Sequence, residues 1–235
     1  MADIASQPEL GLVEGHQSWT NTGPLTSHLQ DAEIAALEVR AAATVAEPGT
    51  LGLWGLATGT WIAATVLGGF LPEGDAISVS LPVLFFAGIT QFIAGLFAYR
   101  RANSLTASAF CSFGALYTAV GVMLLLGAVG VVVPQTGLPE QMGFLLESYA
   151  FIALALTLAA LRHNLVLTCL LAALCAGYAL TGIGQFTVGA AGLGIVAEAG
   201  GACLLAAAFL AYYLGLALLA NSAWNRPFFP ILGEP

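Results

Sequence analysis

Long stretches without a charged residue dominate this chain. Residues 48–72, 76–99, 102–139, 164–197 and 199–225 contain no charge, and 143–161 contains only Glu147. A charge at the centre of a bilayer costs about 2.5–3.5 kcal/mol, and about 20 apolar residues form a helix that crosses it. The pattern therefore predicts six membrane-spanning helices, at about 51–71, 80–100, 104–132, 143–161, 164–183 and 191–220, with a break in helical structure at 182–185. Alternation with a period of two is absent, so the predicted fold is an all-α polytopic membrane protein rather than a barrel.

The first 46 residues differ from the rest. They hold six of the thirteen acids and no apolar run of the kind found in a signal peptide. Ser27 is a plausible helix N-cap, and Leu29, Ile34 and Leu37 then interleave with acidic residues. We expect a short, solvated surface helix here, because its acidic face is repelled by anionic lipids. The chain thus divides into a tail, 1–46, and a transmembrane domain, 47–235.

The composition agrees with a membrane protein. Only 8% of the residues are charged and 59% are hydrophobic, against about 25% charged in an ordinary soluble domain. The five basic residues do not cluster, which excludes a nucleic-acid partner. The four cysteines lie in apolar runs and the three histidines are isolated, so we expect free thiols, no metal and no cofactor.

The arginines predict the orientation. With six spans, Arg40, Arg162, Arg226 and the pair Arg100–Arg101 all fall on one side, whereas Glu73, Asp75 and Glu140 fall on the other. Arginine is enriched on the cytoplasmic side of membrane proteins. Both termini are therefore expected in the cytoplasm, with the protein in the plasma membrane.

Three candidates for proton or pH chemistry stand near the predicted span ends. Glu147 and Glu198 lie near the outer face, where each is either a functional acid at membrane depth or a solvated carboxylate beside a helix N-terminus. His163, beside Arg162, is either a pH sensor or a solvated loop residue. Pairs of small residues, Gly55 with Gly59 and Ala197 with Gly201, predict close helix packing.

Short motifs follow one another from about residue 47 to the end of the chain. They read EPGTLGL at 47–53, FFAGITQFIAG at 85–95, YRRAN at 99–103, AFCSFG at 109–114 and LRHN at 161–164, followed by paired glycines, paired tyrosines and NSAWNR at 221–226. In order and spacing they resemble the NPAPLGL, FFGGxxQxxAG, E(Y/F)RRGN, AFxSYG and LRxN motifs of the acetate uptake transporters, the succinate–acetate permease family.

The resemblance implies a function and a site. It implies a homohexamer with one pore in each six-helix protomer, carrying acetate and related small monocarboxylates, and in some members succinate. Pro48 would break the helix at the inner mouth and leave N–H groups free for an anion. The residues implied for the pathway are Pro48, Leu51, Gly52, Leu53, Gln91, Asn103 and Ser112, and those implied for a narrow apolar constriction are Phe70, Phe113 and Leu180.

The chain also departs from the family pattern. Glu47 replaces the first asparagine of the signature and places a carboxylate at the mouth of an anion pathway, unless it faces solvent or is protonated. Ala98 and Leu218 replace family acids, and Phe113 lacks the hydroxyl of the SYG tyrosine. Proton symport and channel-like flux therefore both stay open, with Glu47, Glu147 and Glu198 as the candidate proton sites.

Two other classes of membrane protein are alternatives to a transporter. An intramembrane hydrolase needs a nucleophile and a base within the spans, and no histidine falls inside them, so we do not expect an enzyme. A non-conducting sensor or scaffold with the same fold is the alternative, because fold does not fix function. The acidic tail and Glu47 favour that alternative.

Overall fold

The computed structural model describes residues 31–37, 46–70, 78, 80–128, 131, 138–186 and 194–232. The chain forms two compact units, Met1–Ala41 and Ala42–Pro235. In the first unit, residues 31–37 are helical, and they lie within the range where the sequence predicts a tail helix. Its apolar residues Ile34 and Leu37 are exposed. Ser27 and Arg40 lie outside the described residues.

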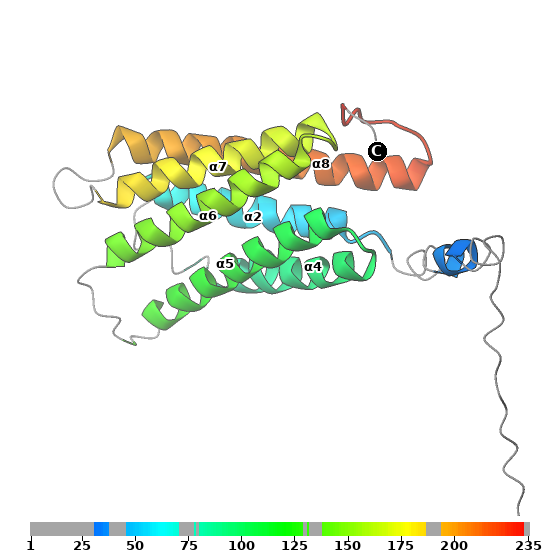
Figure 1. Ribbon diagram of the computed structural model, residues 1–235. Helices are drawn as coiled ribbons and strands as arrows, with labels where there is room; N and C mark the ends of the chain where they lie inside the picture. Colours follow the sequence, from blue (N-terminus) through cyan, green and yellow to red (C-terminus); the bar gives the residue numbers. More distant parts are fainter. Residues whose placement is uncertain are drawn as a thin grey trace, which may run out of the picture. The chain divides into compact units, whose positions relative to one another are not determined.

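The second unit is a bundle of long helices. They are α2 (Gly49–Leu67), α3 (Ser80–Pro82), η2 (Val83–Thr90), α4 (Gln91–Arg100), α5 (Ser104–Ala128), α6 (Leu138–Ala160), α7 (Leu165–Phe186) and α8 (Ile195–Trp224). The helices lie side by side along one direction (Figure 1), and no strand occurs in the described ranges. Because α3, η2 and α4 continue one another, the described residues contain six helices long and apolar enough to cross a membrane, which confirms the predicted number and the all-α class.

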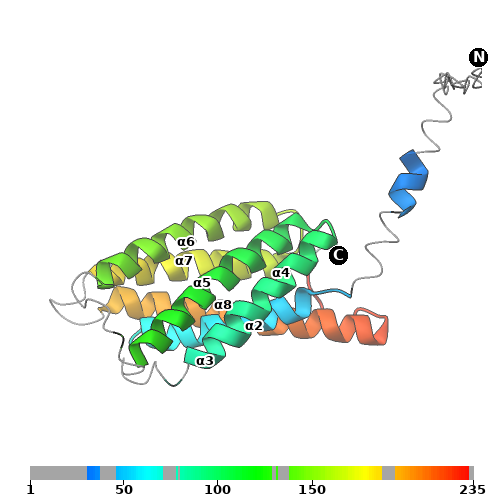
Figure 2. The same ribbon diagram turned by 90° about the horizontal axis from the view of Figure 1, so that it is seen from below.

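The helices pack in a closed sequence of neighbours. α7 contacts both α6 and α8, α8 contacts α2, and α5 contacts η2 and α4. Seen from below, α5 lies between α4 and α6 (Figure 2). Large apolar side chains, such as Phe85, Phe151 and Phe209, remain exposed on the outside of the bundle. In a membrane this outer surface faces lipid, which accounts for an apolar exterior.

Several predicted boundaries were wrong. The fourth span begins at Leu138 rather than 143, and the last begins at Ile195 rather than 191. The first span ends at Leu67 rather than near 71, because the chain turns at Gly69, whose φ is 72°. The last helix continues to Trp224 rather than 220, and Asn225 ends it in the left-handed conformation. The break expected at 182–185 does not occur, since α7 continues to Phe186.

Glycines in α7 serve close packing instead of ending the helix. A Cβ atom on Gly182 would lie 2.8 Å from Oε1 of Glu147 on α6, and one on Gly184 would lie 2.7 Å from the Cβ atom of Ala197 on α8. The missing side chains therefore let α7 approach both neighbours. The small-residue pairs predicted from the sequence behave similarly, because Gly55 contacts Gln91 and Gly201 contacts Gly68.

The second span is not a regular α-helix. Residues 83–90 form a π-helix, in which the Thr90 hydroxyl donates a hydrogen bond to the Phe85 carbonyl, five residues earlier, at 2.9 Å. Gly88 in this segment packs on the backbone of Thr118 on α5. π-Helical turns are rare and frequently mark functional sites, and this one ends directly before Gln91.

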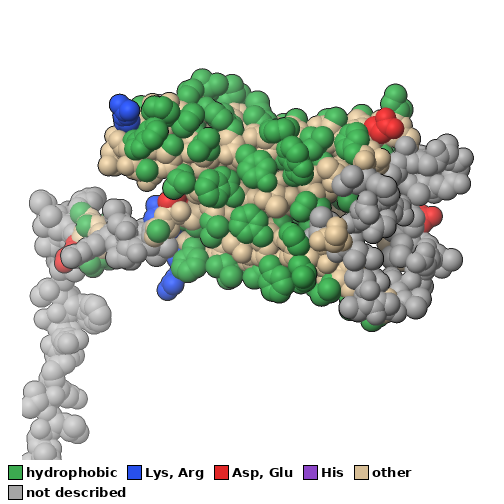
Figure 3. All heavy atoms as spheres, turned by 180° about the vertical axis from the view of Figure 1, so that it is seen from behind, with side chains coloured by type: hydrophobic (Ala, Val, Ile, Leu, Met, Phe, Trp, Pro, Cys, Tyr) green, Lys and Arg blue, Asp and Glu red, His purple; other side chains and the backbone are tan. Residues whose placement is uncertain are grey.

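The two ends of the bundle differ in charge. Successive spans run in alternating directions, so the ends of α4, α6 and α8 lie at the end of the bundle where α2 begins. We call this the arginine end, because it holds Arg100, Arg101, Arg162 and Arg226. Glu140 and Glu198, in the first turns of α6 and α8, mark the opposite end, the acidic end. In Figure 3 the basic side chains of the bundle lie at one end of an apolar surface, with an acidic one beside them, and the other acidic side chains lie at the opposite end.

Candidate functional site

A cavity of about 330 Å³ opens at the arginine end. Its walls come from α2, α5, α7 and α8, with Ile231 of the C-terminal segment added. Polar groups stand among otherwise apolar walls: Glu47, Asn103, Thr106, His163 and Asn164. We call this the arginine-side cavity.

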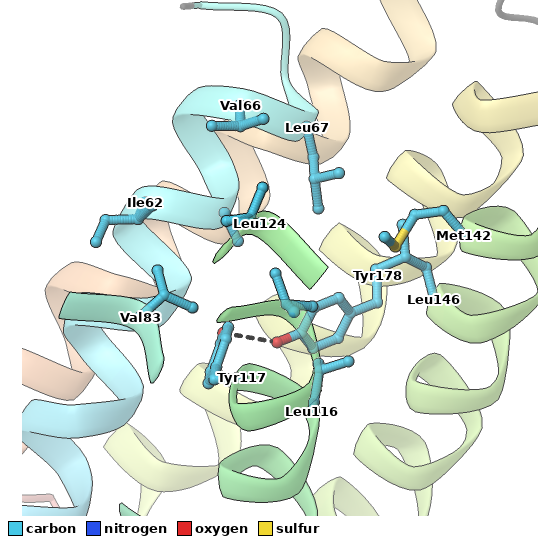
Figure 4. Close-up of a pocket in the computed structure, with 13 residues that line it drawn as sticks. Ile62, Val66, Leu67, Val83, Leu116, Tyr117, Leu124, Met142, Leu146 and Tyr178 are labelled. Carbon is cyan, nitrogen blue, oxygen red and sulfur yellow. Dashed lines mark hydrogen bonds between the residues drawn. The ribbon is translucent and has the colours of Figure 1, made fainter. Parts of the chain in front are cut away.

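A second, smaller cavity of about 110 Å³ lies nearer the acidic end. It is lined by apolar side chains from α2, η2, α5 and α6, together with the rings of Tyr117 and Tyr178 (Figure 4). We call this the acidic-side cavity. The same helices, α2, α5 and α7, supply walls to both cavities.

A buried layer separates the two cavities. On α2 the arginine-side cavity ends at Leu56 and the acidic-side cavity begins at Gly59. On α5 and α7 the intervening stretches are 111–115 and 172–177, which include Phe113 and Leu174. Leu56, Phe113 and Leu174 are all buried. The gap between the two linings is three residues on α2, six on α5 and seven on α7, which corresponds to a rise of about 4.5–10.5 Å. These three side chains are hereafter the closing layer.

The α2 N-terminus already holds a carboxylate. The helix begins after Pro48, as expected, and the Gly49 N–H donates a hydrogen bond to Oε1 of Glu47 at 3.1 Å. The other oxygen, Oε2, lies 3.1 Å from Nη2 of Arg101. The Glu47 side chain is 49% exposed. Like-charge repulsion at the mouth is thus offset by Arg101, an arrangement that the sequence analysis did not anticipate.

The other residues implied by the signature have different surroundings. Leu53 lines the arginine-side cavity, and Asn103 does so while accepting a hydrogen bond from the Thr106 N–H at 3.1 Å. Gly52 packs against the Phe110 ring, which leaves no room for a side chain. Leu51 is largely exposed on the outside of the bundle.

Gln91 and Ser112 do not line either cavity. Gln91 is 0% exposed, and neither its Oε1 nor its Nε2 atom has a hydrogen-bond partner among the described residues. An unpartnered buried amide is costly, so this side chain is a candidate to bind water or substrate. The backbone carbonyl of Ser112 accepts a hydrogen bond from the Tyr149 hydroxyl at 3.1 Å.

The structure places only one of the three residues implied for the constriction in the closing layer. Phe113 is there, with its ring stacked 6.0 Å from that of Tyr178. Phe70 follows the end of α2, is 49% exposed and packs on Gly68 and Gly201. Leu180 packs against Gly200. Phe70 and Leu180 therefore lie at the α2–α8 and α7–α8 contacts, outside both cavity walls.

The candidate proton sites and His163 differ in burial and in surroundings. Glu147, in α6, has a buried Oε1 atom without a hydrogen-bond partner in the described part of the chain, and it lies beside Gly182. Glu198 is exposed in the first turn of α8. His163 lines the arginine-side cavity. Among the three acids, Glu147 alone combines a position within a span with a buried, unpaired oxygen.

Several residues of this region were missed from the sequence. They are Leu56, Leu174, Thr60, Tyr117 and Tyr178. Nothing in the pattern singles out one leucine among many. Tyr117, Tyr178 and Thr60 did carry a signal, because a hydroxyl inside an apolar span must find a hydrogen-bond partner.

The chain is similar to several known proteins. The chain is 28% identical over 190 residues to the succinate-acetate/proton symporter SatP of Escherichia coli K12, an alignment covering 80% of this chain and 95% of that protein. It is 28% identical over 187 residues to ammonia transport outward protein 2 of Saccharomyces cerevisiae, covering 75% of this chain and 64% of that longer relative. The structure of the bacterial acetate channel SatP matches the fold with a TM-score of 0.69 and 25% identity, over 79% of this chain and 98% of that one.

A family assignment rests on most of the chain. The sequence profile of the GPR1/FUN34/yaaH family matches residues 32–231, which include all six spans. The motifs noted from the sequence lie within the same range. This chain is an integral, multi-pass membrane protein and belongs to the GPR1/FUN34/yaaH family.

Proposed function

We propose that this protein carries acetate and related small monocarboxylates across a membrane, along a pathway within each protomer. The observation that carries the proposal is the pair of cavities on opposite sides of one apolar closing layer, built from the same three helices. The names of the bacterial relatives, an acetate channel and a succinate-acetate/proton symporter, support the substrate class.

The arginine-side cavity suits a small carboxylate. Asn103 and Asn164 offer amide groups there, and Arg101 offsets the charge of Glu47. Amide donors can replace part of the water around a carboxylate without binding it too tightly to leave. This cavity is therefore proposed as the first binding position from the arginine end.

The closing layer is proposed as the constriction. Its leucines and phenylalanine offer no hydrogen bonds, so a hydrated anion crosses only when the side chains move and water is shed. Phe113 would keep the role expected for it, and Leu56 and Leu174 would take the roles expected for Phe70 and Leu180.

Coupling to protons is a separate question. Ala98 is buried and Leu218 lines the arginine-side cavity, so neither family acid is available. Glu47 is held by Arg101. In a symport mechanism Glu147 would be the acid that takes up and releases the proton; in a channel mechanism no such group is needed.

The deciding experiment is uptake of labelled acetate into proteoliposomes, with and without an inward proton gradient. Accumulation that collapses with a protonophore indicates symport, and equilibration without accumulation indicates a channel. Phe113→Ala is expected to raise the uptake rate several-fold and to admit larger acids, whereas Phe151→Ala, on the outer face, should leave both unchanged. If the unaltered protein and Phe113→Ala both carry no acetate, the sensor or scaffold alternative gains; labelled methylammonium tests the ammonia function named for the yeast relative.

The assembly and orientation implied by the sequence belong to the same proposal. We propose a homohexamer in the plasma membrane with the arginine end in the cytoplasm. The asymmetry of the described arginines supports the orientation. A mass measurement in detergent that gives a monomer would contradict the hexamer.

A further inference from the structure

Three hydroxyl groups meet in the interior of the bundle. Thr60 on α2, Tyr117 on α5 and Tyr178 on α7 come from the three helices that line both cavities. The Thr60 Oγ1 atom lies 2.7 Å from the Tyr117 hydroxyl, which lies 2.9 Å from the Tyr178 hydroxyl. All three side chains are at most 2% exposed. We call them the hydroxyl cluster.

The cluster has one donor more than it uses. Three hydroxyls carry three protons, and the two contacts between them consume two. Each oxygen also has spare acceptor capacity. A buried hydroxyl proton without an acceptor is unfavourable. The cluster is thus nearly satisfied by itself and still able to donate a hydrogen bond to a further group.

The cluster stands directly behind the acidic-side cavity. The rings of Tyr117 and Tyr178 form part of the cavity wall, and the Tyr178 hydroxyl points toward Tyr117 (Figure 4). On the other side, Tyr178 stacks on Phe113 of the closing layer, with 6.0 Å between ring centroids. A solute that passes the closing layer therefore meets the rings of Tyr117 and Tyr178 next, with their hydroxyls buried behind them.

We propose that the hydroxyl cluster is a binding site for the carboxyl group of the transported acid, occupied as the acid passes between the closing layer and the acidic-side cavity. This inference rests on the proposed function and adds a specific site to it. Without substrate the hydroxyls bond to one another and the wall presented to the cavity is apolar. With substrate, small rotations of the tyrosine side chains exchange those bonds for bonds to the carboxyl oxygens.

The cluster lies near a position where this chain departs from the family motif. Phe113 replaces the tyrosine of that motif. Tyr117 lies one helical turn further along α5, and Tyr178 stacks on Phe113 from α7. The hydroxyl that is missing at 113 is thereby supplied by two neighbours on the acidic side of the closing layer.

The acidic-side cavity sets the expected selectivity. Its volume of about 110 Å³ equals roughly three to four water molecules at about 30 Å³ each. A two- or three-carbon acid fits with its hydrocarbon end among Val66, Leu116 and Leu146. A second carboxylate would be buried there without partners, so the site favours monocarboxylates over dicarboxylates such as succinate.

The test compares Tyr117→Phe and Tyr178→Phe with the unaltered protein in proteoliposomes. Each substitution keeps the ring and removes only the hydroxyl. The control is Tyr212→Phe, because Tyr212 also pairs its hydroxyl with a threonine of α2, Thr58, at 3.0 Å, but on the exposed side of the bundle. Thr60→Val adds a third variant of nearly unchanged shape. Thermal unfolding of each variant identifies any loss of folded protein.

The expected result is an acetate uptake rate at least about ten-fold lower in both cluster variants, because a hydrogen bond to a charged group is lost. The Tyr212→Phe rate should equal that of the unaltered protein. The rate in the cluster variants, relative to the unaltered protein, should fall more at a pH where acetate is fully ionised than at a pH near the ordinary carboxyl pKa of about 4.3. Uptake by empty liposomes is subtracted at each pH. A smaller amount of active protein would lower the rate equally at both pH values.

Other groups that titrate near the cluster do not confuse this comparison. Tyr149 has its ring 6.5 Å from that of Tyr178. Cys175 lies about one turn before Tyr178 on α7, and Glu147 of α6 lies beside Gly182, about one turn after Tyr178. All three are present in every protein compared. The variants therefore differ from one another only in the hydroxyl removed.

Two results would overturn the inference while leaving the proposed function intact. One is acetate uptake by both cluster variants at the rate of the unaltered protein. The other is an equal loss of acetate uptake rate in the cluster variants and in Tyr212→Phe, when the ratio of the rates at the two pH values is the same in every variant as in the unaltered protein. Absence of uptake in the unaltered protein would instead contradict the proposed function, and the inference with it.

Discussion

Glu47 illustrates how much a single residue depends on its surroundings. As a sequence feature it is a negative charge at the mouth of an anion pathway. In the fold, one oxygen of its carboxylate accepts the Gly49 N–H and the other pairs with Arg101. Both partners come from the arginine end, so the local field at the mouth is set by a pair rather than by one charge.

Substitution Glu47→Gln keeps an oxygen for the Gly49 N–H but removes the negative charge from the ion pair. We expect acetate to be taken up at a two- to five-fold lower half-saturating concentration at low salt, because the negative charge of Glu47 at the mouth no longer repels the anion. The effect should fade as salt is added, since the Debye length is about 10 Å at 0.1 M. The free energy of unfolding should change by less than about 1 kcal/mol, because both side chains of the pair are partly exposed to solvent.

The measurement is acetate uptake against concentration at two ionic strengths. Glu140→Gln is the matched control, since Glu140 is an exposed acid in the first turn of α6 at the opposite end. Equal effects of the two substitutions would mean that overall charge, and not the pair at the mouth, governs uptake.

Glu147 is the acid whose removal should abolish coupling if the protein is a symporter. Its Oε1 atom is buried and unpaired in the described structure, which suits a group that gains and loses a proton. We expect Glu147→Gln to equilibrate acetate without accumulating it under an inward proton gradient. Glu198→Gln, at an exposed position, should accumulate acetate normally; the opposite pattern would assign coupling to Glu198.

At the scale of the elements, glycines control how closely the helices approach. Gly88 of η2 and Gly114 of α5 face one another, and a Cβ atom on Gly88 would lie 2.7 Å from the backbone nitrogen of Thr118. A backbone atom cannot move aside as a side chain can. The contact between η2 and α5, which positions Phe113 and Gln91, therefore requires glycine.

Substitution Gly88→Ala should separate η2 from α5 and destabilise the protein by about 1–3 kcal/mol, the usual cost of overpacking. Thermal unfolding in detergent measures the change as a lower midpoint. Gly194→Ala is the control, because no atom lies within 4 Å of a Cβ atom built there. Similar midpoints for both variants would show that the close approach is not needed for stability.

At the scale of the whole molecule, the distribution of charge predicts orientation. The four described arginines share one end, and this asymmetry is expected to place that end in the cytoplasm. In a variant without the four native cysteines, Pro227→Cys should react with an impermeant thiol reagent only from the cytoplasmic side. Gly194→Cys should react only from the other side. Reversed labelling would contradict the proposed orientation.

The spans were predictable because the bilayer acts on every residue of a helix in the same way. Absence of charge over about 20 residues is a local property that needs no knowledge of neighbours. The number of spans was therefore correct, and the start of the first helix after Pro48 was also visible in the sequence. The prediction of a break at 182–185 was wrong because Gly182 packs against α6 and Gly184 packs against α8. Such contacts between helices cannot be read from the local sequence.

The sequence by itself determined the all-α class, the six spans, the side to which the arginines fall and the family that the motifs resemble. Only the tertiary structure decided which side chains meet inside the bundle. Leu56, Phe113 and Leu174 are more than fifty residues apart in the chain, yet they form one layer, and Glu47 meets Arg101 in the same way. The physical reason is that hydropathy acts on each residue separately, whereas a site depends on the rotation and spacing of helices, which are fixed by packing between them.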